Sequence, residues 1–301
     1  MQARLIAYVP EGAAIARIVA PGDRLRIGRA VESDLVLPHA SVSRRHAELG
    51  PQPDGTWRLT DLSSKNGSFV DGGRIANADL SRSSWLRFGD VHCEFTMLDD
   101  RAAEDQVRRW QERRTHATRL TARIEAMAPA QAGAAPAPAL LEHSLRAVLE
   151  LAQCTRGFVL VAEGGRYRVA TSIALDASLA TGTEFTGSLG AVAQALRSHA
   201  PVVYNDVVQD ALLSGRESVV RSGLRTLVAL PLLDGGNALG AIYADRREAG
   251  PPLTTLDVEL LQAFAERCAL WLAAHGEANP QPSPPVPGEW QNLLADHGGT
   301  R

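Results

Sequence analysis

Residues 4–98 consist of short runs in which apolar and polar residues alternate, and turn residues separate these runs every few positions. Two examples are residues 5–9 and 25–27, and two of the turns are Pro21-Gly22-Asp23 and Asp54-Gly55. Alternation with a period of two is typical of strands with one buried face, and many short strands at close spacing indicate an all-β sandwich. The loops of such a sandwich gather at its ends, where a rigid scaffold can hold a binding site.

Three polar pieces in this region carry side chains that suit a phosphorylated ligand. A phosphorylated side chain brings close to two negative charges and three acceptor oxygens. Arg29 can bind two of these oxygens with its fork, which a lysine does not reproduce, and Ser43 can donate from its hydroxyl group. The sequence therefore predicts a phosphopeptide site made of these residues: Arg29, Ser43, Arg44, Lys65 and Asn66.

Within this set, Arg44 and Lys65 supply positive charge, whereas Asn66 suits a peptide main chain because its amide both donates and accepts. Gly67 permits the positive φ that a tight Asn-Gly turn requires. Taken singly, a Gly-Arg or an Asn-Gly pair is common in ordinary turns. Their order along one segment is what favours a common site.

The pieces Gly28-Arg29, Ser43-Arg44-Arg45-His46 and Ser64-Lys65-Asn66-Gly67 together resemble the signature of the forkhead-associated (FHA) domain. The resemblance implies a sandwich of about eleven strands that prefers phosphothreonine, through its methyl group, to phosphoserine. It also implies that Gly28 and His46 belong to the scaffold. Some FHA-like modules bind their partners without phosphate, so that alternative stays open.

Between residues 99 and 127 the period becomes helical. A solvated single helix and a helix that packs on its twin in a homodimer both fit this segment, and the second accounts better for Trp110 and Ile124. Residues 128–139, rich in Ala and Pro, are predicted to be a semi-rigid linker.

Residues 140–275 mix helix and strand patterns: two hairpins are expected, around Gly164-Gly165 and around Gly235-Gly236, and a final helix is expected to begin near Thr254. The order of elements resembles a GAF domain, an α+β module with a central antiparallel sheet. The resemblance rests on Leu230-Pro231-Leu232, Leu239-Gly240-Ala241-Ile242-Tyr243, and Asp257 followed by Leu260, Leu261, Phe264 and Ala265.

The GAF resemblance implies a ligand cleft between the sheet and residues 174–222. Polar candidates there are Tyr204, Asn205, Asp206 and Arg216. A module that only dimerises is the other interpretation, since the last helix is apolar on more than one face. The proline-rich residues 276–301 are predicted to be disordered.

Composition excludes several classes of protein. The net charge of −3 gives no support for a nucleic-acid or membrane partner, and the cysteines, Cys93, Cys154 and Cys268, have neither disulfide nor metal spacing. No apolar window reaches the length of a membrane span or has the form of a signal peptide. We therefore expect a cytoplasmic protein.

No nucleotide-binding loop, metalloprotease motif or serine-hydrolase motif is found, so neither an enzyme nor a cofactor is predicted. The sequence predicts a multi-domain signalling adaptor in which an FHA-like sandwich binds a phosphothreonine-containing protein and a GAF-like domain dimerises or senses a small molecule. Two alternatives remain: a phosphate-independent assembly scaffold, and a sensor in which the GAF-like domain controls FHA binding.

Overall fold

The computed structural model describes residues 1–10, 12–127, 137–163, 166–175, 187–205 and 223–275. The chain divides into two compact units, Met1–Glu112 and Arg113–Arg301. The first is an all-β sandwich, and the second is an α+β domain with a central antiparallel sheet. One long helix connects them, so the multi-domain architecture predicted above is confirmed.

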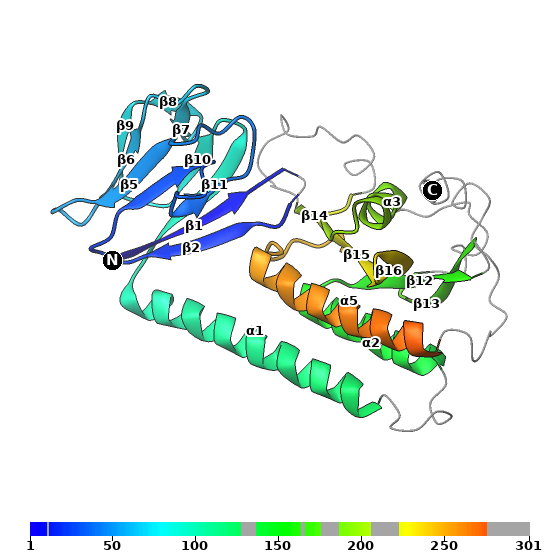
Figure 1. The fold of residues 1–301 in the computed structure, drawn as a ribbon. Helices are drawn as coiled ribbons and strands as arrows, with labels where there is room; N and C mark the ends of the chain where they lie inside the picture. The colour runs from blue at the N-terminus through cyan, green and yellow to red at the C-terminus, as the bar shows by residue number, and fades with distance from the viewer. Residues whose placement is uncertain (11, 128–136, 164–165, 176–186, 206–222, 276–301) are drawn as a thin grey trace. The chain divides into compact units, whose positions relative to one another are not determined.

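The sandwich consists of two sheets (Figure 1). The larger has the strand order β2-β1-β11-β10-β7-β8 and the smaller the order β4-β3-β5-β6-β9. Trp57, Phe88 and Phe95 are among the largest side chains buried between them. The strand bounds are β1 Gln2–Tyr8, β2 Ile15–Val19, β3 Leu25–Gly28, β4 Leu35–Val36, β5 Ala47–Pro51, β6 Trp57–Asp61, β7 Ser68–Val70, β8 Gly73–Ile75, β9 Asn77–Leu80, β10 Ser84–Phe88 and β11 Val91–Leu98.

The alternating runs of the sequence form strands in the structure. The described part of this unit contains eleven strands, as the FHA resemblance implied. β8 and β9 are not marked by any run in the sequence. They are three and four residues long and largely exposed, so they bury only one residue fully, Leu80. Pairing with β7 and β6, respectively, makes them strands.

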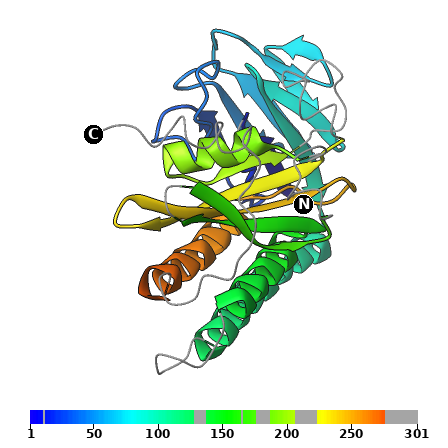
Figure 2. The ribbon, with the colours of Figure 1, turned by 90° about the vertical axis from the view of Figure 1, so that its right-hand side faces the viewer.

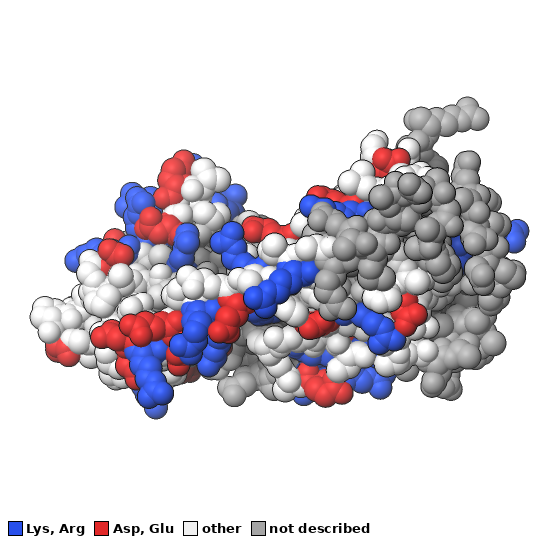
Figure 3. All heavy atoms as spheres, turned by 90° about the horizontal axis from the view of Figure 1, so that it is seen from below, with Lys and Arg blue, Asp and Glu red and all other residues white. Residues whose placement is uncertain are grey.

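Helix α1, Asp100–Met127, follows the sandwich. Its first turn is capped by the Asp99 carboxylate, which accepts a hydrogen bond from the Ala102 N–H at 2.7 Å. Acidic and basic side chains are interspersed on the face of the molecule seen in Figure 3. Within the second unit, Ala117 and Leu120 belong to the hydrophobic core. The part of α1 that carries these two residues therefore packs within the second unit of its own chain, and a second copy is not needed to bury them.

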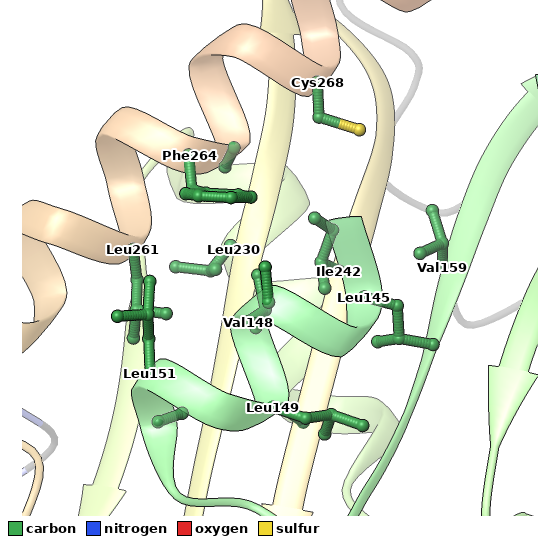
Figure 4. Close-up of a cluster of buried hydrophobic side chains, with 14 of the residues drawn as sticks. Leu145, Val148, Leu149, Leu151, Val159, Leu230, Ile242, Leu261, Phe264 and Cys268 are labelled. Atoms are coloured by element: carbon green, nitrogen blue, oxygen red, sulfur yellow. The ribbon is translucent and has the colours of Figure 1, made fainter. Parts of the chain in front are cut away.

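The second unit has a five-stranded antiparallel sheet of order β13-β12-β16-β15-β14. Helix α3 lies on one face, and helices α2 and α5 lie on the other (Figure 2). Leu145 and Val148 of α2, Phe264 of α5 and the sheet residue Leu230 belong to one buried cluster between the sheet and these helices (Figure 4). The bounds are α2 Ala137–Ala152, β12 Arg156–Glu163, β13 Arg166–Ile173, α3 Leu189–Ser198, β14 Val202–Asn205, β15 Thr226–Asp234, β16 Asn237–Arg246 and α5 Thr255–His275.

Local sequence signals explain several of these boundaries. Gly235 and Gly236 have φ values of 53° and 94°, as the predicted hairpin turn requires. Asp257 accepts hydrogen bonds from the N–H and the hydroxyl of Thr254, both at 2.8 Å, and so caps α5. Ser188 caps α3 through the N–H of Ala191. The two predicted hairpins and the predicted start of the final helix are therefore confirmed.

One predicted boundary was wrong. Helix α2 begins at Ala137, within the segment 128–139 that was predicted to be linker. Pro138 is tolerated there because the N–H groups of a first helical turn need no partner within the helix. Residues 128–136 and the tail 276–301 lie outside the described residues.

Candidate functional site

Loops at one end of the sandwich surround a concavity of about 870 Å³, here called the loop pocket. The loops are those between β3 and β4, between β4 and β5, and between β6 and β7. All five predicted site residues line it, although they are as far apart as positions 29 and 66. The complete lining is Arg26, Ile27, Arg29, Ala30, Glu32, Ser33, Ala40, Ser41, Val42, Ser43, Arg44, Arg45, Ala47, Glu48, Leu62, Lys65 and Asn66.

Ser43 connects these loops through three hydrogen bonds. Its carbonyl accepts from the N–H of Arg29 at 2.9 Å, and its hydroxyl oxygen accepts from the N–H of Lys65 at 3.0 Å. Its own N–H donates to Nδ1 of His46 at 3.0 Å. Because the hydroxyl oxygen accepts from the protein, its proton is left to donate into the pocket. The half-buried hydroxyl therefore holds one orientation before any ligand arrives.

His46 is fully buried and holds two loops together. Since its Nδ1 accepts from Ser43, its Nε2 must carry the proton that it donates to the carbonyl of Gly67, at 3.1 Å. Burial lowers the pKa of His46 below its ordinary value of 6.5, which keeps the ring neutral in this tautomer. The scaffold role predicted for His46 is confirmed.

The turn that carries Lys65 and Asn66 is held by Asp61. Its carboxylate accepts from the hydroxyls of Ser64 and Ser68, each at 2.6 Å, and from the N–H of Ser64 at 2.9 Å. Burial alone would raise the pKa of Asp61, but these hydrogen bonds outweigh burial and lower it. The carboxylate is therefore a structural anion that fixes the turn.

Arg29 and Asn66 each use part of their hydrogen-bonding capacity within the protein. Nε of Arg29 donates to the carbonyl of Val42 at 3.3 Å, and within the described chain its terminal nitrogens have no ion pair. Nδ2 of Asn66 donates to the carbonyl of Ser41 at 2.7 Å, which orients the amide and leaves its oxygen as an acceptor. Both side chains are exposed and oriented by the backbone of a neighbouring loop.

Gly28 allows the β3 strand to approach the loop of Arg44. A Cβ atom at position 28 would lie 2.2 Å from the carbonyl oxygen of Arg44, a backbone atom that also accepts from the N–H of Ala30 at 3.1 Å. No side chain fits there without moving the loop. The structural role predicted for Gly28 is confirmed.

Two residues that matter in this geometry are not among the five predicted site residues. Arg45 lines the loop pocket beside Arg44, and Ser41 accepts hydrogen bonds from Asn66 and, through its hydroxyl, from the N–H of Asp90 at 2.8 Å. Arg45 belongs to the Ser43-Arg44-Arg45-His46 piece, so its position in the sequence could have indicated a place in the pocket. The contact between Ser41 and Asp90 spans 49 residues and has no counterpart in the sequence pattern.

In the second unit, Asn205, one of the polar candidates named above, is bonded to another segment of the chain. Its amide bonds the backbone of Leu253 in both directions, donating to the carbonyl at 3.0 Å and accepting from the N–H at 2.8 Å. These bonds hold the segment before α5 against the end of β14. Tyr204 is half-buried, whereas Asp206 and Arg216 lie outside the described residues.

The three cysteines are buried and unpaired with one another, and burial raises the pKa of the Cys154 and Cys268 thiols to about 12. Within the described ranges, no group of three or more His, Cys, Asp or Glu side chains has the arrangement of a metal site. None of the helices in those ranges has both the length and the apolar composition of a membrane span.

Comparisons with known proteins agree with the two folds. Residues 25–89 match the model of the FHA domain, and residues 137–272 match the model of the GAF domain. The chain is 40% identical over 75 residues to the ABC transporter ATP-binding/permease protein Rv1747 of Mycobacterium tuberculosis, a match that covers 25% of this chain and 9% of that protein. It is 41% identical over 71 residues to the FHA domain-containing protein FhaB of Mycolicibacterium smegmatis, covering 23% of this chain and 45% of that protein.

The chain thus spans less than half the length of these curated relatives. Among solved structures, it is similar to the FHA domain of CT664 from Chlamydia trachomatis, with 24% identity, a TM-score of 0.31, and coverage of 33% of this chain and 100% of that one. An FHA domain described for phosphothreonine-dependent interactions is 25% identical, with a TM-score of 0.29 and coverage of 32% of this chain and 98% of that one.

Proposed function

The chain contains an FHA domain followed by a GAF domain, and we propose on this basis that it is a phosphothreonine-dependent protein-binding adaptor in signal transduction. In this proposal the loop pocket captures a phosphorylated segment of a partner protein, and neither domain performs catalysis. Both domains belong to families of regulatory modules. We place this activity in the cytoplasm, where kinases supply the phosphorylated partner.

One observation carries the proposal: Arg29, Ser43 and Asn66 come from three different loops and line one pocket. Arg29 offers a guanidinium fork, and Ser43 offers a hydroxyl proton whose direction is set by the N–H of Lys65. A phosphate dianion accepts both, because hydrogen bonds from charged or pre-oriented donors to its oxygens are short and strong. The oriented amide of Asn66 then accepts from, or donates to, the peptide main chain beside the phosphorylated residue.

The role of Arg29 can be separated from that of simple positive charge. Arg29→Lys retains the charge but removes the fork, and Arg29→Ala removes both. We expect the wild-type chain to bind peptides from a phosphothreonine library. Arg29→Lys should weaken this binding by about tenfold or more, and Arg29→Ala should abolish it. Arg82→Ala is the matched control, because Arg82 is 82% exposed and does not line the pocket.

Equal binding of phosphorylated and unphosphorylated peptides would replace this proposal with the phosphate-independent scaffold. Peptide binding that is unchanged in Arg29→Ala would show that the phosphate is recognised elsewhere. Fluorescence anisotropy with labelled peptides measures both outcomes. Circular dichroism of each variant checks that the sandwich remains folded.

For the GAF domain we propose a dimerising role, with small-molecule sensing as the alternative. Leu270 on α5 is 65% exposed, while its neighbours Trp271 and Leu272 are buried in the domain core. An exposed leucine on this helix supports contact with a second copy, and a homodimer would present two FHA domains with a gain in avidity of about a hundredfold or more. Light scattering of the full chain gives twice the monomer mass if this is correct. Native mass spectrometry shows a retained small molecule if the domain is a sensor.

A further inference from the structure

Five of the twelve basic side chains in residues 1–98 have an ion pair in the described structure, and four of the seven that have none line the loop pocket. Arginines elsewhere on the sandwich form the ion pairs Arg4–Glu94, Arg24–Glu48, Arg58–Asp79 and Arg82–Asp71, at 2.6 to 3.9 Å. At the pocket, Arg26 is likewise paired, with Asp34 at 2.9 Å. Across the described part of the chain, four pocket side chains have no ion pair: Arg29, Arg44, Arg45 and Lys65.

The pocket holds little negative charge to balance these four cations. Its lining contains two carboxylates, Glu32 and Glu48, and Glu48 is bound to Arg24 at 2.6 Å. Glu32 is therefore the one lining carboxylate without an ion pair in the described structure. The whole chain has a net charge of −3, so this local excess does not reflect a generally basic protein.

The excess is larger than one phosphate group neutralises. Four cations and one carboxylate leave three positive charges, and a phosphorylated threonine at neutral pH carries between about −1.5 and −2. About one positive charge is then left at the rim of an occupied pocket. This remaining positive charge favours a ligand that brings a further negative charge close to the phosphate.

Arg45 is the best placed of the four to bind that second charge. Arg29 and Lys65 flank Ser43 through backbone hydrogen bonds, which places them at the phosphate position proposed above. Arg45 lies between two backbone anchors: the carbonyl of residue 44 accepts from Ala30 at 3.1 Å, and the N–H of His46 donates to Ile27 at 2.9 Å. The backbone of Arg45 is thus fixed at the pocket wall, and the guanidinium group of its exposed side chain remains available to a ligand.

We propose that the loop pocket selects phosphopeptides that carry an acidic residue close to the phosphothreonine, and that Arg45, assisted by Arg44, is the specificity-determining residue for that acidic position. This inference rests on the proposed phosphopeptide function and specifies its substrate class. It assigns to Arg45 a contact separate from the phosphate contacts of Arg29 and Ser43.

The test uses the full chain and a phosphothreonine peptide in a neutral Ala/Gly/Ser frame. A single Glu is placed in turn at each position on both sides of the phosphothreonine, and each peptide has a matched Gln version. In the wild type, Glu binds about three- to fivefold more tightly than Gln for at least one position at 50 mM salt, as expected for one exposed ion pair. The ratio declines at 300 mM salt because the interaction is screened.

The variants then assign the residue. Arg45→Gln brings the Glu-to-Gln ratio close to one while binding of the neutral phosphopeptide changes by less than about threefold. Arg82→Gln, outside the pocket, leaves the ratio unchanged. Glu32→Gln removes the opposing charge and tightens binding of the acidic phosphopeptide.

Four outcomes contradict the inference in distinguishable ways. If no phosphopeptide binds better than its unphosphorylated form, the proposed function itself fails. If phosphopeptides bind but Glu and Gln are equivalent at every position, only the acidic preference fails. A preference that persists in Arg45→Gln overturns the residue assignment. Equally tight binding of an unphosphorylated acidic peptide would make the pocket a general polyanion surface.

Discussion

His46 connects the two loops that carry Ser43 and Gly67, so its removal tests the architecture of the loop pocket. His46→Ala leaves a cavity in a fully buried position and removes two hydrogen bonds and an edge-to-face contact with Phe88, whose ring centroid is 5.7 Å away. Gly67 keeps one partner, since its carbonyl also accepts from Gly89 at 3.2 Å, whereas the N–H of Ser43 loses its partner.

The expected loss follows from these contacts. Truncation of a buried ring costs about 3 kcal/mol or more, and an orphaned, half-buried N–H adds about 1 kcal/mol. A loss of about 4 kcal/mol or more in a domain of this size lowers its melting temperature by roughly 16 °C or more. Differential scanning calorimetry of the full chain resolves the FHA and GAF transitions, which need not melt together. Only the FHA transition moves.

The pH dependence provides a second readout from the same variant. Because burial lowers the pKa of His46 in the folded protein below 6.5, the unfolded chain binds this proton more readily. Folding stability therefore falls as pH decreases below 6.5, and the fall ends once the folded-state pKa is passed. His46→Ala lacks this contribution, whereas His143→Ala, at an exposed site on α2, retains it. A melting temperature for His46→Ala within about 3 °C of the wild type would refute the reasoning.

Two further predictions concern a close backbone contact and a buried ion pair. Gly28→Ala places a Cβ atom 2.2 Å from the Arg44 carbonyl, so we expect a loss of about 1 to 3 kcal/mol and weaker phosphopeptide binding, whereas Gly22→Ala, in open space, changes binding little. Unchanged binding by folded Gly28→Ala would contradict this. Arg113→Met leaves Asp257, 3% exposed and bonded to Arg113 at 3.0 Å, without its cation. The GAF transition should then drop by about 4 to 8 °C, and a drop no larger than that of a neighbouring exposed-arginine variant would contradict the prediction.

Much of the fold was readable because its signals are local. Alternation of apolar residues marks a strand with one buried face wherever that strand lies in the sandwich, and the hydroxyl and carboxylate of Thr254 and Asp257 cap a helix without help from distant residues. β8 and β9 were not predicted because they are short and largely exposed, and only their pairing partners make them strands. The start of α2 was misplaced since a proline is compatible with both a linker and a first helical turn.

The sequence by itself determined the chemistry of the loop pocket, because guanidinium, hydroxyl and amide groups are properties of residue types. The tertiary structure decided where those groups meet and what each one retains for a ligand. Ser43 keeps its proton since Lys65 occupies its acceptor side, and Asn66 keeps its oxygen since Ser41 takes one of its N–H groups. The excess charge around Arg45 likewise depends on which carboxylates lie within reach, and ion pairs are set by distance in space.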